Sequence, residues 1–276
     1  MKTKILIQGV IAAAAIGLFF SSCKKDDSSV TPPKPNLTTG TTKVATENAS
    51  AEAAFADAFH QVDKAIKESN SKDLNSCPTV TFSPADLTFP KDLIIDFGTS
   101  CTGDDGVIRS GKILAHLTKL YTDSGSVTTI TFDNFFVNGH QITGTEIITN
   151  MGKNLAGHHV FEVVVQNGNY YSPDGITTYN SVQQREWIEG DSTLLDPMDD
   201  VYLITGTADG VTTDGTNYSV IITSALRVAV GCAWVESGTL DISQAGMPVI
   251  TLDYGNGDCD NIAIATCSGY TVTIYM

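Results

Sequence analysis

Basic residues are scarce in this sequence. It has 16 Lys and Arg residues against 31 Asp and Glu residues, so its formal net charge at pH 7 is −15. Nucleic acids and anionic lipid surfaces attract proteins through positively charged patches, and a chain this acidic offers little of that attraction. The composition therefore argues against a nucleic-acid partner and against membrane adhesion through surface charge.

Motifs that carry familiar catalytic chemistry are also missing. The five histidines form no His-x-x-x-His or Glu-x-x-His pair that could hold zinc on a helix. The chain has no Gly-x-Ser-x-Gly turn for a serine nucleophile and no glycine-rich phosphate loop after a strand. Two facing carboxylates drawn from distant positions are the catalytic arrangement that the sequence leaves open.

The one long apolar run lies at the N-terminus. Two lysines precede the almost wholly apolar residues 5–20, and the small residues Ser21 and Ser22 follow them. This order is typical of a secretory signal peptide, and the run is shorter than the roughly 20 residues that span a bilayer. We therefore expect a cleaved signal at residues 1–22.

Cys23 directly follows the two serines. Residues 20–23 resemble the lipobox of bacterial lipoproteins, although that family prefers Leu where this chain has Phe20. The resemblance implies cleavage before Cys23 and attachment of lipid to its sulfur, and two or three acyl chains anchor a protein stably. The alternative is an ordinary secretory signal beside an unrelated cysteine.

Residues 23–46 are rich in Pro, Thr, Ser and charged side chains. Such a segment has too few apolar groups to offset its ordering entropy, so it is expected to be a flexible tether. The acidic pair Asp26 and Asp27 resembles the surface-export signal of Bacteroidota lipoproteins. The resemblance implies an outer-membrane protein exposed at the cell surface, with the periplasmic face as the alternative.

The remaining chain, residues 47–276, repeats part of itself. Residues 77–114 and 232–274 share the order cysteine, proline, apolar strand, Asp-aromatic-Gly and cysteine. The repeat predicts disulfides Cys77–Cys101 and Cys232–Cys259, each stabilising the fold by about 3–4 kcal/mol. Cys267 lies in an apolar run and is expected to be a buried free thiol.

Short alternating runs of β-branched and aromatic residues predict strands, and Asn-Gly and Asp-Gly pairs between them predict hairpin turns. Ile-Thr-Gly-Thr occurs at both 142–145 and 204–207, and Ser-Gly precedes apolar runs at 110–112 and 237–239. Residues 47–68 carry apolar side chains at helical spacing. We expect a mainly β fold, an antiparallel meander or sandwich-like domain with an internal duplication and one N-terminal amphipathic helix.

The order of these motifs resembles a family of uncharacterised Bacteroidota surface lipoproteins. The matching residues include the block from Asp96 to Cys101 and residues 132–139, 202–207, 232–238 and 253–261. The resemblance implies that this chain shares its fold and location with those lipoproteins. It implies no activity.

Two kinds of ligand site are suggested by the residues themselves. Asp253, Asp258 and Asp260 stand in a Gly- and Asn-rich loop, and clustered carboxylates of this kind suit calcium. An acidic hairpin held by a disulfide explains the same residues without metal. Glycans stack on exposed aromatic rings, for which the candidates are Phe135, Phe136, Tyr170, Tyr171, Trp187 and Trp234, with core packing as the alternative.

The sequence therefore favours a binding or structural module of the envelope over an enzyme. A glycan, a soluble ligand and another envelope protein are the open partners, besides the membrane that acylated Cys23 would enter. An envelope hydrolase with a carboxylate-based site is one alternative. A periplasmic carrier of lipid or envelope components is another, and it requires an apolar cavity.

Overall fold

The computed structural model describes residues 40–67, 77–86, 88–193, 197–232 and 234–275. Residues 36–276 form one compact unit that contains every described helix and strand. Within the described residues, the fold is one α-helix and fourteen strands in a single antiparallel sheet, whose order follows the chain from β1 to β14 except that β3 pairs only with β4. The predicted mainly β meander with one N-terminal helix is confirmed, as one continuous sheet.

The strands alternate buried and exposed residues, as expected for a sheet with one covered face. Strand β3 pairs beside β4, and a short 3-10 helix, η1, precedes β9. The elements are α1 Gly40–Lys67, β1 Thr79–Ser83, β2 Lys91–Asp96, β3 Cys101–Thr102, β4 Ile108–Leu117, β5 Val127–Val137, β6 His140–Lys153, β7 His159–Ser172, β8 Gly175–Glu189, η1 Pro197–Asp199, β9 Val201–Val211, β10 Asn217–Ala229, β11 Ser237–Gln244, β12 Ile250–Asn256, β13 Ile262–Cys267 and β14 Tyr270–Tyr275.

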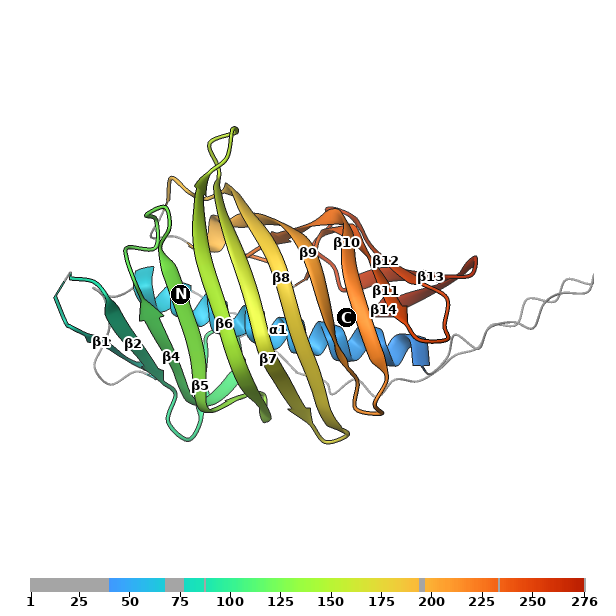
Figure 1. Cartoon of the computed structure of the whole chain (residues 1–276), viewed down its shortest axis with the longest axis horizontal. Helices are drawn as coiled ribbons and strands as arrows, with labels where there is room; N and C mark the ends of the chain where they lie inside the picture. The colour runs from blue at the N-terminus through green and yellow to red at the C-terminus, as the bar shows by residue number, and fades with distance from the viewer. Residues whose placement is uncertain (1–39, 68–76, 87, 194–196, 233, 276) are drawn as a thin grey trace, which may run out of the picture. The chain divides into compact units, whose positions relative to one another are not determined.

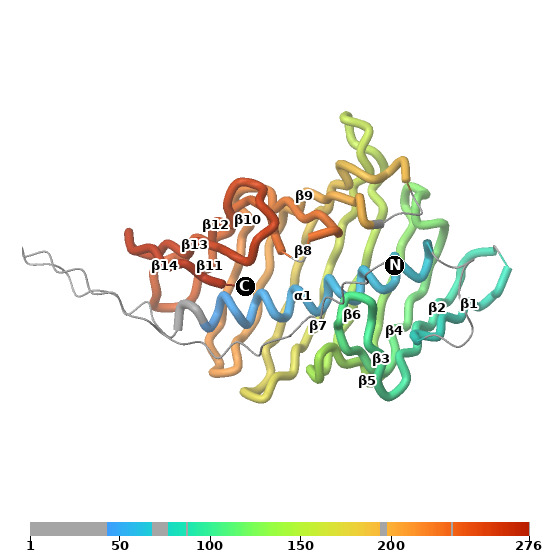
Figure 2. Tube along the Cα trace, turned by 180° about the vertical axis from the view of Figure 1, so that it is seen from behind, coloured from blue at the N-terminus to red at the C-terminus, as the bar shows by residue number. Residues whose placement is uncertain are grey.

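Helix α1 lies across the strands on one face of the sheet, from β10 to β4 (Figures 1 and 2). It packs on β2 and on β4 to β8 through one apolar stripe. The members of this stripe are buried and fall three, four or seven residues apart, the spacing of one helix face. They are Val44, Ala51, Phe55, Ala58, Val62 and Ala65.

The helix begins at Gly40, before the start predicted near residue 47 and inside the segment expected to be a tether. Val44 and Ala45 are buried and extend the apolar face by another turn. Lys43 forms an ion pair with Asp214, at the turn between β9 and β10, with 3.2 Å between Nζ and Oδ2. These tertiary contacts stabilise helical backbone in a stretch whose composition predicts a linker.

The four Ser/Thr-Gly repeats in the sequence mark places where strands bend. Their glycines, at positions 111, 144, 206 and 238, all have positive φ, and register shifts accompany several of them. A Cβ at Gly206 would lie 2.2 Å from the carbonyl oxygen of Val182 on the neighbouring strand β8. Glycine bulges of this kind increase local twist and bend a sheet. Here they let the sheet curve around α1.

Both duplicated blocks fold alike. In each, a cysteine precedes a first strand, and a second cysteine follows the antiparallel second strand: β1 and β2 in the first block, β11 and β12 in the second. The disulfides Cys77–Cys101 and Cys232–Cys259 have the predicted pairing and the same Cα–Cα distance of 5.8 Å. The predicted bridges are therefore confirmed, and Cys267 is buried and free.

The close approach of β9 to β8 at Gly206 can be tested by substitution. Gly206→Ala should lower the free energy of unfolding by about 1–3 kcal/mol more than Gly215→Ala does, because it adds a steric clash to the strain of a positive φ. Gly215 also has a positive φ, but a Cβ there would meet nothing within 4 Å. Urea unfolding of both variants measures the difference. Equal losses would show that the close approach of β9 to β8 does not constrain the sheet.

Candidate functional site

The sequence-predicted ligand residues do not come together in a site. Cys23 lies outside the described residues, as does most of the expected tether. Asp253, Asp258 and Asp260 are exposed near the turn between β12 and β13. Asp253 accepts a hydrogen bond from the backbone N–H of Gly255, and Asp260 accepts one from Ile262, both at 2.9 Å. Across the described residues, no group of three or more His, Cys, Asp or Glu side chains is arranged to hold a metal ion.

Of the aromatic candidates for glycan stacking, Phe136 and Tyr171 are half-buried, and the other four lie in the core or beside a cavity. Phe135 and Trp187 are fully buried, so both are core residues, as the alternative interpretation expected. Tyr170 packs against the hydrophobic core, and His140 stacks on its ring. Trp234 is different, because it lines a cavity between α1 and the C-terminal strands.

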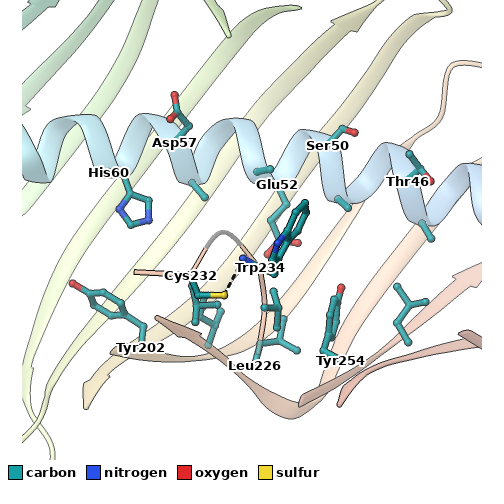
Figure 3. A pocket seen from close by; sticks show the side chains of 18 of the residues that line it. Thr46, Ser50, Glu52, Asp57, His60, Tyr202, Leu226, Cys232, Trp234 and Tyr254 are labelled. Atoms are coloured by element: carbon teal, nitrogen blue, oxygen red, sulfur yellow. Dashed lines mark hydrogen bonds between the residues drawn. The ribbon is translucent and has the colours of Figure 1, made fainter. Parts of the chain in front are cut away.

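This cavity has a volume of about 540 Å³. Its roof is the N-terminal part of α1, and its floor consists of residues from β9, β10, β12 and β14 (Figure 3). Most of the lining is apolar, including Leu226, Val228, Leu252 and Ile274. Thr46, Ala53 and Tyr275 also line it and are exposed, so the cavity opens to solvent at its rim.

The cavity exists because one face of α1 carries a row of alanines. Ala45, Ala49, Ala53 and Ala56 recur at helical spacing and line the roof. The face that carries Phe55 fills the space above β5 to β8 instead, where its ring contacts Phe132 and Tyr179. The sheet and the helix therefore pack tightly over β5 to β8 and leave a gap over the C-terminal strands.

Trp234 is held beside the cavity by the second disulfide. It follows Cys232, and its backbone N–H lies 3.4 Å from the Sγ atom of that residue. From this loop the indole extends toward α1, opposite Tyr254 on β12 (Figure 3). The duplicated block thus contributes a large aromatic wall, and its bridge to Cys259 fixes the loop from which that wall rises.

Two carboxylates of α1 also line the cavity, and each already has a partner. Glu52 accepts a 2.9 Å hydrogen bond from Nε2 of Gln183, and burial raises the pKa of the Glu52 carboxyl group. Asp57 accepts a 2.8 Å hydrogen bond from Nε of Arg109, whose guanidinium also contacts the second oxygen of Asp57. Neither is a free acid–base group facing a second carboxylate.

Two basic residues line the cavity, Arg185 on β8 and His60 on α1. Burial, together with the nearby charge of Arg185, lowers the pKa of His60 to about 4, so His60 is neutral at pH 7. Arg185 is only 8% exposed, and its guanidinium carbon lies 4.9 Å from the centre of the Phe59 ring. The cavity is therefore an apolar space with one buried positive charge in its wall.

A buried carboxyl group lies behind this wall. Glu146 on β6 is fully buried, and neither of its carboxylate oxygens has a hydrogen-bond partner among the described residues. Burial raises its pKa to about 8, against a smaller opposing effect of the Arg185 charge. At pH 7 the group is therefore mainly protonated. Sequence reasoning missed both Glu146 and Arg185.

No family model, curated protein or solved structure matches this chain. The resemblance to Bacteroidota surface lipoproteins therefore stays a prediction. In the part of the chain that the structure describes, no helix has the length and apolarity to span a membrane.

The buried Glu146 predicts a pH-dependent stability. The folded protein keeps this proton up to about pH 8, whereas the unfolded chain releases it near pH 4.5, so raising the pH favours unfolding. Between pH 5 and 8, Glu146 should lower the free energy of unfolding by on the order of 3 kcal/mol. Glu146→Met should remove this part of the pH dependence.

Urea unfolding at several pH values measures the effect as a difference between the variant and the wild type. Glu162→Gln is the matched control, because Glu162 lies on the neighbouring strand β7 between the buried residues Phe161 and Val163 and so points to the other face. The account of the core is wrong if Glu146→Met and wild type lose stability in parallel as the pH rises.

Proposed function

We propose that the folded domain binds an apolar small molecule in the cavity between α1 and the C-terminal strands. The cavity itself carries the proposal: about 540 Å³, mainly apolar walls and an opening at the rim. Sites for small ligands typically have volumes of about 300–1,000 Å³, with apolar walls and a few placed polar groups. A ligand that covers these walls gains about 25 cal/mol for each Å² of apolar surface removed from water.

The shape of the site fits a flexible chain better than a sugar. Glycan sites need exposed aromatic faces, whereas here Trp234 and Tyr254 form the wall of an apolar space. A hydrolase receives no such support, because Glu52 and Asp57 are each engaged by Gln183 or Arg109. An acyl chain or a similar aliphatic group is therefore the ligand class that we favour.

A neutral fluorescent dye, N-phenyl-1-naphthylamine, tests the proposal on the compact unit, residues 36–276. We expect saturable binding to the wild type, with a fluorescence increase at about one site per molecule. Ala49→Phe should weaken that binding at least tenfold, because a ring at this roof position occupies the cavity.

Val182→Phe is the matched control, since it adds the same ring at a half-exposed position away from the cavity. It should leave dye binding unchanged. Equal dye affinities for the wild type and Ala49→Phe would mean that the dye sits elsewhere, and absence of binding to the wild type would remove the proposed function.

For the location, we propose an outer-membrane lipoprotein held by acyl chains on Cys23 and exposed at the cell surface. The lipobox-like residues before Cys23 and the acidic pair after it support this assignment. Cys23→Ser should release the protein from the membrane fraction. Protease added to intact cells should remove the wild-type domain. Protection until the outer membrane is opened would favour the periplasmic face and a carrier role.

A further inference from the structure

Arg185 is a buried cation that the protein itself leaves poorly satisfied. Within the part of the chain that the structure describes, its guanidinium makes one long hydrogen bond, 3.3 Å from Nη2 to Oε1 of Gln183. Its Nε atom is buried and has no hydrogen-bond partner among the described residues. No described carboxylate lies within 4 Å of its nitrogen atoms. A buried charge without a counter-ion is costly, so this arrangement calls for an explanation.

The other buried cations show how this protein satisfies such groups. Arg109 is 3% exposed and pairs with two carboxylates, those of Asp57 and Asp105. Lys91 donates to the backbone carbonyl oxygen of Asp86 and lies near the ring of Phe82. Arg185 has neither a carboxylate nor a short hydrogen bond, although it lines a cavity that opens to solvent.

The nearest carboxyl groups do not take the place of a counter-ion. Glu52 accepts its hydrogen bond from Gln183 and lies beyond ion-pair distance of Arg185. Glu146 is protonated at pH 7, because its pKa is raised to about 8. His60, on the facing helix, is neutral at the same pH. The positive charge at the cavity wall is therefore left for a molecule that enters the cavity.

We propose that the cavity takes a single-chain lipid with an anionic head group, and that Arg185 binds that head group. This inference rests on the proposed function and names its ligand class. The guanidinium presents fixed N–H donors that match carboxylate and phosphate oxygens. The aliphatic chain then lies against the apolar floor formed by Leu226, Val228 and Leu252.

Competition against the neutral dye tests the inference with three probes that share a twelve-carbon chain: dodecanoate, dodecyl phosphate and dodecanol. For the wild type at pH 7, we expect at least one anion to displace the dye at a concentration about tenfold or more below dodecanol. Charge-assisted hydrogen bonds of this kind are worth factors of about 10 to 100 in affinity. The two anions distinguish a carboxylate from a phosphate head group.

The variants assign the preference to the side chain. Arg185→Gln should remove the preference for the anion over dodecanol. Arg185→Lys should keep much of the preference, because it keeps the charge.

The outcomes separate the two proposals. If the dye binds but the anions and dodecanol displace it equally, the head-group inference is overturned and the apolar site stands. If Arg185→Gln binds the dye and keeps the anion preference, Arg185 is not the residue that binds the head group, and the inference also fails. If the dye does not bind the wild type, the proposed function fails first. If Arg185→Gln no longer binds the dye, the head-group inference is decided by Arg185→Lys and by the three-probe comparison on the wild type.

Discussion

The structure depends on the attachment of α1 to the buried face of one curved sheet. A single sheet cannot form a core alone, so the helix supplies the second layer. Its apolar stripe, centred on Phe55, packs over β4 to β8, and Gly168 on β7 leaves room for that ring: a Cβ at Gly168 would lie 2.8 Å from it. The close fit fixes the height of the helix above the sheet.

Polar contacts set the position of the helix along its length. Glu47 accepts hydrogen bonds from Thr177 and Thr213 near its N-terminal end. Near its C-terminal end, Lys67 forms ion pairs with Asp63 and Asp200 at 3.0 and 2.8 Å. Buried pairs of this kind add little net stability, but losing one partner leaves a costly unpaired charge. They therefore oppose any sliding or rotation of α1.

With the helix fixed in this way, the cavity follows from sequence. Phe55 and the alanines at 45, 49, 53 and 56 lie on different faces of one helix, so the space over β5 to β8 is filled and the end over the C-terminal strands is open. The second disulfide then holds Trp234 at the edge of the open end. The same layout leaves Arg185, on the inward face of β8, as a charge in an otherwise apolar wall. The cavity and the buried charge of Arg185 in its wall are thus both consequences of the way α1 packs on the sheet.

Much of this architecture can be predicted from the sequence. The hairpin turns, the strand patterns and the two disulfides are local or repeated signals. The start of α1 has no such local signal in the sequence, because contacts of Lys43 and Val44 with distant residues override a linker-like composition. The cavity could have been suspected from the alanine spacing over residues 45–56, and Arg185 from its alternation with Trp187. Whether such a face is filled depends on how far the sheet bends, which no local pattern records.

Photo-crosslinking tests the central claim, that the space under the alanine face of α1 is a binding site, most directly. A neutral aliphatic diazirine is irradiated with the compact unit, and the labelled peptides are mapped by mass spectrometry. The account predicts labels in residues 45–60 of α1 and in β10, β12 and β14, which disappear in Ala49→Phe. Labels spread over the outer face of the sheet, or unchanged by that substitution, would contradict it.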